Sequence, residues 1–148
     1  MKKEQLDNLT KGSRPSLHPC TPNWETLKGL VARARDSIAD ASKKTNSAPT
    51  RFAAAYSAAF WLARAALEAC GYRPAGSEGH RVAVFQSLAN TLDWDAPRWR
   101  RLDDMHKLRN RFDYGDVVEI PAQQLESAIS GAKDLLGDLV KTFPNLKP

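Results

Sequence analysis

The sequence predicts an all-α fold, an antiparallel bundle of four to five helices connected up and down. Apolar residues recur every three or four positions in five stretches, and no stretch alternates apolar and polar residues as a half-buried strand does. The 148 residues, 42% hydrophobic and 26% charged, suffice for one domain with its own core. We expect residues 1–20 to form an N-terminal arm that consists of a short helix and a loose remainder. Residues 21–148 should form a single helical domain.

The first two long helices are marked by their caps and by their apolar stripes. Thr21 and Pro22 are expected to open the first, as a capping residue and a proline at the first helical position. Its inward residues are Trp24, Leu27, Val31, Ala34, Ile38 and Ala41. After a break at residues 46–49, the inward residues of the second are Phe52, Tyr56, Phe60, Ala63, Leu67 and Cys70. Gly71 and Pro74 should end it.

Three further helices are expected in the second half of the chain. Ser77 is the expected cap of a short helix with Val84, Phe85, Leu88 and Leu92 turned inward. Asp95 and Pro97 should open a basic helix over residues 97–114, which Gly115 ends. After the connector 117–120 and Pro121, a last helix should bury Leu125, Ile129, Ala132, Leu136, Leu139 and Phe143.

The formal net charge of +5 is concentrated in the basic helix. Residues 98–111 hold six arginines and lysines against two aspartates, which gives this segment four of the five net positive charges. Such a local excess permits an acidic partner such as RNA. We therefore consider Arg100, Arg101, Lys107, Arg111 and the neighbouring Trp99 as RNA-binding candidates, with Trp94 as a second aromatic able to stack on a base.

Cysteines and apolar runs predict the compartment. Cys20 and Cys70 lie fifty positions apart and belong to no metal-binding motif, so we expect neither a disulfide framework nor a zinc site. Asp93 and Asp95 alone are weak evidence for a metal, and no cofactor is indicated. No apolar run is long enough for a membrane span or a secretion signal, so we expect a cytoplasmic protein with no membrane partner.

Arg109 occupies an unusual position on the basic helix. On a helical wheel it falls between Leu102 and Met105, on the apolar stripe, where an arginine needs a partner or a groove. One interpretation is a structural ion pair, for instance with Asp113 one turn later. The other is a guanidinium that binds phosphate in a cleft, because its paired donors match phosphate oxygens.

The residues around Arg109 resemble a known motif. Arg109 and Asn110, followed after three residues by Tyr114, resemble the R-x4-H motif of the HEPN superfamily, in which Arg-Asn is followed by three residues and His. Residues 56–67, the turn 71–74 and residues 79–85 are similar to the corresponding helices of small bacterial HEPN proteins. The pair Asp113-Tyr114 resembles a branch of those proteins.

The resemblance implies a four-helix up-and-down bundle, commonly a homodimer, with the motif near the dimer cleft. Many such domains are metal-independent endoribonucleases of toxin–antitoxin or defence systems, often beside a nucleotidyltransferase-type antitoxin. On that scheme Arg109 holds the scissile phosphate, Asn110 orients it, and the residue at position 114 handles the proton of the ribose 2′-hydroxyl.

The sequence departs from the motif at Tyr114, since an ordinary tyrosine is a poor base at pH 7. His106, one turn before Asn110 on the same side of the helix, is another candidate base, ahead of His80 and His18. Two functions stay open: an RNA-cleaving HEPN-like protein, and a non-catalytic HEPN-like module that binds RNA, a nucleotide or a partner protein as a dimer. A third possibility is a bundle subunit in which Arg109 only stabilises a dimer.

Overall fold

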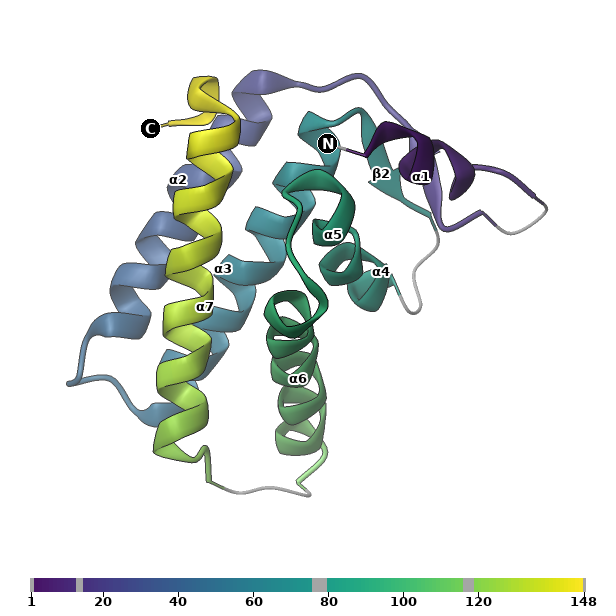
Figure 1. Cartoon of the computed structure of the whole chain (residues 1–148). Helices are drawn as coiled ribbons and strands as arrows, with labels where there is room; N and C mark the ends of the chain where they lie inside the picture. Colours follow the sequence, from purple (N-terminus) through teal and green to yellow (C-terminus); the bar gives the residue numbers. More distant parts are fainter. Residues whose placement is uncertain (1, 13–14, 76–79, 116–118, 148) are drawn as a thin grey trace.

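The computed structural model is an all-α bundle, and it describes residues 2–12, 15–75, 80–115 and 119–147. The long helices are α2 (Trp24–Ser42), α3 (Ala48–Ala69), α6 (Ala96–Asp113) and α7 (Ala122–Thr142). Helix α3 packs against each of the other three, while α6 lies beside α7 (Figure 1). The fold class predicted from the apolar periodicity is confirmed.

Helix α2 begins later than its sequence signals suggested. The Asn23 side chain accepts a hydrogen bond from the Thr26 amide at 3.1 Å, so Asn23 is the cap and the expected start at Thr21 and Pro22 is wrong. Trp24, expected inside, is 38% exposed because it is the first residue of the helix. The rest of the predicted stripe is buried: Leu27, Val31, Ala34, Ile38 and Ala41.

Helix α3 forms the centre of the core because small and aromatic residues cover several of its faces. It is capped by Ser47 and ends at Cys70, after which Gly71 takes a φ of +92° that favours glycine. Its buried alanines let neighbouring helices approach closely. On the opposite side of the core, buried Gly131 of α7 faces Leu102 of α6, where an added Cβ would lie 3.2 Å from Leu102 Cδ2.

The N-terminal arm packs against the bundle instead of lying loose. Its short helix α1 (Lys3–Asn8) is present as expected, but strand β1 (Leu17–Pro19) pairs antiparallel with β2 (Tyr72–Pro74). Leu6 and Leu17 are buried with Leu67 and Tyr72 in a small second core. Burial of these apolar side chains explains why the described residues of the arm pack against the bundle.

The expected short helix after residue 79 is divided in two. Helix α4 (His80–Gln86) and helix α5 (Leu88–Thr91) are separated at Ser87, whose hydroxyl donates to the Val84 carbonyl at 2.6 Å. The expected cap Ser77 and the connector residues 117 and 118 lie outside the described residues. A 3-10 turn, η1 (Pro144–Leu146), follows α7.

Helix α6 starts as predicted, with the Asp95 side chain accepting from the Arg98 amide at 3.1 Å. Just before it, Trp94 is only 3% exposed and donates from Nε1 to Asp138 of α7 at 2.8 Å. Asp138 also accepts from Arg98 at 2.9 Å, and the Arg98 guanidinium covers the Trp94 ring at 4.1 Å. Trp94 therefore anchors α6 to α7, and the expectation that it stacks on a base is wrong.

Candidate nucleic-acid interface

Two sides of α6 carry the candidate residues, and the first is a polar group centred on His106. His106 Nδ1 lies 3.0 Å from the hydroxyl of Tyr56 on α3, and its Nε2 lies 3.3 Å from the Asn110 side-chain nitrogen. The Tyr56 and His106 rings lie nearly parallel, with centroids 6.1 Å apart. Contacts on both ring nitrogens hold the imidazole in one orientation.

These contacts match one tautomer of His106. An amide nitrogen donates, so Nε2 accepts from Asn110, and the proton on Nδ1 is donated to the Tyr56 oxygen. The lone pair of Nε2 is occupied by the amide hydrogen of Asn110. Nε2 can therefore bind a proton only after this hydrogen bond breaks, or after the Asn110 amide rotates so that its oxygen faces Nε2. The group therefore fixes the orientation of the His106 ring, and Nε2 can exchange a proton only when Asn110 releases it.

Arg109 lies beside this group and has two partners of its own. Its guanidinium carbon is 5.0 Å from the centroid of the Tyr56 ring, within the range of a cation–π contact. Its Nε is 3.7 Å from Asp113 Oδ2, which is the ion pair that the sequence suggested as one alternative. The side chain is 35% exposed, so Arg109 is held by these contacts and still reaches solvent.

Tyr114 occupies a different position from the other motif residues. It is the C-cap of α6, its amide donates to the Asn110 carbonyl at 3.1 Å, and its residue is 83% exposed. Gly115 follows with a φ of +78°. The structure thus brings together Arg109, Asn110 and His106 through Tyr56, and it places Tyr114 at the exposed end of the helix.

The second side of α6 faces a cleft of about 320 Å³ toward α7, which we call the α6–α7 cleft. It is lined by Phe52, Arg101, Asp104, Met105, Lys107, Leu108, Arg111, Gln124 and Ser127. Phe52, Met105 and Leu108 are buried and form an apolar floor. Three cations and one aspartate among the lining residues give the cleft a net positive charge.

The cations of the α6–α7 cleft are only loosely engaged by the protein. An Arg101 guanidinium nitrogen lies 3.4 Å from the Ser127 carbonyl, and Lys107 lies 3.6 Å from an oxygen of Asp103. Arg111 is exposed in the last turn of α6. Contacts of this length leave most donors of the three side chains available to an anion.

The remaining sequence candidates lie outside both groups. The Arg100 guanidinium carbon is 5.2 Å from the centroid of the Trp99 ring, and Trp99 is half-buried against the core. His18 is exposed on β1, while the side chain of His80 lies outside the described part of the structure. Asp95 caps α6, and Asp93 lies 4.0 Å from Lys2. No cluster of three or more metal-ligating side chains occurs among the described residues.

Sequence reasoning missed Tyr56, Gln124 and Ser127 as parts of these groups. Tyr56 was expected only as a core aromatic, although a buried tyrosine needs a partner for its hydroxyl, and that need was the available signal. Gln124 and Ser127 carry no signal, because their place beside α6 follows from how α7 packs.

Comparison of the sequence with protein families and with curated proteins finds no match for this chain. Within the described residues, no helix is long and apolar enough to cross a membrane.

Proposed function

We propose that this chain is an RNA-associated protein of HEPN type that binds the backbone of single-stranded RNA along α6. The observation that carries the proposal is the α6–α7 cleft, where Arg101, Lys107 and Arg111 surround an apolar floor. Cationic rims hold phosphates, and apolar or aromatic surfaces accept unstacked bases. Phe52, Met105 and Leu108 are buried beneath the cations, so the phosphate contacts of the cationic side chains carry the proposal.

The position of the charge supports RNA over an acidic protein surface. The cations follow one helix over residues 101–111, about 15 Å of helix axis, which is the reach of a few nucleotides. Arg109 lies on the neighbouring side of the same helix and retains exposure. A strand that follows α6 can therefore meet both groups.

The binding test measures fluorescence anisotropy of a short labelled single-stranded RNA at low salt. Arg101→Ala combined with Arg111→Ala should weaken binding about tenfold or more, since each removes a charge-assisted phosphate contact. Lys28→Ala combined with Arg35→Ala is the matched control, because it removes the same charge from the exposed face of α2. Equal weakening by both double variants would show attraction to net charge alone and would refute a site on α6.

Metal-independent RNA cleavage is the second candidate function, and the orientation of His106 favours it. A base that accepts the proton of a 2′-hydroxyl lets that oxygen attack the adjacent phosphorus. The bond between phosphorus and the 5′-oxygen then breaks, which leaves a cyclic phosphate, and the departing 5′-oxygen takes a proton and becomes a hydroxyl. Arg109 lies beside His106, over the ring of Tyr56, and is placed to neutralise the phosphate charge.

The cleavage test incubates diverse RNAs with the protein in EDTA. The candidate predicts cleavage that His106→Ala and Arg109→Ala abolish and that Tyr114→Phe leaves unchanged, because Tyr114 is 83% exposed at the end of α6. Tyr114→His tests the alternative that position 114 supplies the base. If all RNAs stay intact while binding is retained, cleavage is refuted and the non-catalytic function stands.

The resemblance to HEPN proteins adds two partners to the proposal. One is a second copy of this chain, and the other is a nucleotidyltransferase-type antitoxin in a cytoplasmic toxin–antitoxin or defence system. Light scattering of the purified chain at micromolar concentration tests the first, with twice the monomer mass expected. A nucleotidyltransferase co-expressed with the chain should co-purify with it if the second is right.

A further inference from the structure

A second pocket, of about 260 Å³, lies at the other end of α3 from Tyr56, and we call it the Glu68 pocket. It is lined by Cys20, Thr21, Pro22, Asn23, Thr26, Leu27, Leu30, Arg64, Glu68 and Arg73. Tyr56 and Glu68 are separated by about 18 Å along the helix axis, so the pocket is distinct from the polar group on α6.

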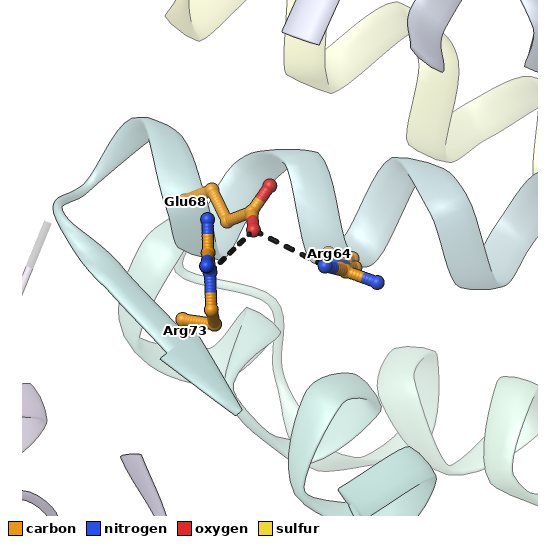
Figure 2. A network of polar contacts seen from close by, with 3 residues as sticks. All are labelled: Arg64, Glu68 and Arg73. Carbon is orange, nitrogen blue, oxygen red and sulfur yellow. Dashed lines mark hydrogen bonds and ion pairs between the residues drawn. The ribbon is translucent and has the colours of Figure 1, made fainter. Parts of the chain in front are cut away.

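Three charged side chains meet in the Glu68 pocket. Glu68 is only 6% exposed, and its Oε1 accepts from Arg73 Nε at 3.2 Å and lies 3.5 Å from a terminal nitrogen of Arg64. Figure 2 shows the two arginines on either side of the carboxylate, one from α3 and one from β2. Two guanidinium groups against one carboxylate leave the pocket with a net positive charge.

Most donors of these two arginines have no hydrogen-bond partner among the residues that the structure describes. A guanidinium carries five N–H groups, and Glu68 engages one nitrogen of each arginine. Within the described residues, Arg64 Nε is buried and has no hydrogen-bond partner. A buried donor without an acceptor is costly, and Arg64 Nε would meet an oxyanion in the pocket only if the Arg64 side chain turned toward it.

The arrangement suits a tetrahedral oxyanion better than a planar carboxylate. One guanidinium can saturate a carboxylate through two parallel hydrogen bonds. Here two guanidiniums from different elements contact Glu68 Oε1 from either side (Figure 2), and their remaining N–H groups can serve a phosphate, which has three accessible oxygens. The remaining wall is uncharged, with polar Thr21 and Thr26 beside apolar Leu27 and Leu30.

We propose that the Glu68 pocket binds a small phosphorylated molecule, with its phosphate against the N–H groups of Arg64 and Arg73 that Glu68 does not engage and its body against residues 21–30. Glu68 holds the two arginines in place and limits their mutual repulsion. The same carboxylate opposes the ligand's charge, so it keeps the affinity moderate. Affinity should therefore rise when that charge is removed without loss of the side chain's shape.

Calorimetric titration of the whole chain with phenyl phosphate, inorganic phosphate and benzoate tests this inference. Phenyl phosphate should bind more tightly than inorganic phosphate, which lacks a body, and than benzoate, which offers a planar carboxylate. Arg73→Ala should weaken phenyl phosphate binding about tenfold. The Arg73 side chain is 58% exposed, so this variant should fold normally.

Glu68→Gln gives the sharper result, because it should strengthen phenyl phosphate binding several-fold, whereas a purely structural carboxylate would leave affinity unchanged. Arg35→Ala, which removes an exposed charge from α2, should not alter the affinity. The absence of saturable binding to the wild type at millimolar phenyl phosphate would overturn the inference. Equal affinity of wild type and Arg73→Ala, or amide shifts confined to α6 in NMR spectra, would overturn it as well.

Discussion

The hydroxyl of Tyr56 lies 3.0 Å from Nδ1 of His106, and this contact joins the middle of α3 to α6 across fifty positions of sequence. Tyr56 is 2% exposed, so its hydroxyl has little access to water. The contact serves the packing of α6 and the orientation of His106 at once.

Removing that hydroxyl should cost stability without opening a cavity. Tyr56→Phe should lower the free energy of unfolding by about 1 kcal/mol, the usual contribution of a buried hydrogen bond. Urea denaturation measures the change, and Tyr114→Phe is the matched control because that hydroxyl is exposed. Equal midpoints for the two variants would mean that the Tyr56 hydroxyl does not stabilise the fold.

Asp138 is predicted to be important for the attachment of α6 to α7. Asp138→Ala leaves the indole N–H of buried Trp94 without its acceptor, which should lower the free energy of unfolding by about 1–3 kcal/mol. Asp134→Ala, one turn earlier on α7 and exposed, should change it by less than about 0.5 kcal/mol. A loss at Asp134 as large as that at Asp138 would contradict the assigned role.

The contact between Tyr72 and Asp7 predicts a loss of stability at alkaline pH. Burial, followed by the hydrogen bond to Asp7 and its charge, raises the pKa of Tyr72 from 10.0 to about 12. Between these values the unfolded chain releases the tyrosine proton and the folded chain retains it. The contribution of Tyr72 is therefore complete below pH 10 and is lost as the pH rises toward 12.

Urea denaturation between pH 9 and 12 checks this prediction. Tyr72→Phe should show a shallower fall in unfolding free energy than wild type, whereas Tyr114→Phe should follow the wild type. The comparison between variants removes the contribution of every other ionisable group, because the variants share those groups with the wild type. Parallel curves for wild type and Tyr72→Phe would exclude Tyr72 as the source of the alkaline loss.

Cys70 should be a slow nucleophile. Burial raises the pKa of its thiol from the ordinary value of 9.0 to about 11, so at pH 8 its thiolate is about a hundredfold scarcer than that of an unperturbed cysteine. Iodoacetamide labelling followed by mass spectrometry should show this difference in the folded chain and its disappearance in urea. Burial also raises the pKa of Cys20. Rapid labelling of Cys70 in the folded chain would contradict the prediction.

Much of the fold could be predicted from local signals. Asp95 was predicted as the cap of α6 because an aspartate side chain can accept a hydrogen bond from the amide three residues later. Gly71 and Gly115 were predicted to end their helices because the residue after a helix often has a positive φ, which glycine adopts easily. The start of α2 was placed wrongly because Thr21 and Asn23 are both good caps, and the choice depends on packing. The strands β1 and β2 are three residues long, too short for alternation to show.

The candidate sites could be predicted only in part. Arg109 lies on the apolar stripe of α6 and pairs with Asp113 one turn later on the same helix. Both features depend on helical periodicity alone, so the helical wheel predicted them from the sequence. The contact of His106 with Tyr56, and the meeting of Glu68 with Arg73, join separate elements. Such contacts depend on tertiary packing, for which a single sequence has no periodic signal.

The salt dependence of RNA binding tests the central claim, that α6 holds the RNA backbone, most directly. If Arg101, Lys107 and Arg111 each contact a phosphate, the logarithm of the wild-type association constant should fall with the logarithm of salt concentration with a slope of about −2. Arg101→Ala combined with Arg111→Ala should reduce the slope by about 1.4, and Lys28→Ala combined with Arg35→Ala should leave it unchanged. An unchanged slope in the first double variant would contradict the claim.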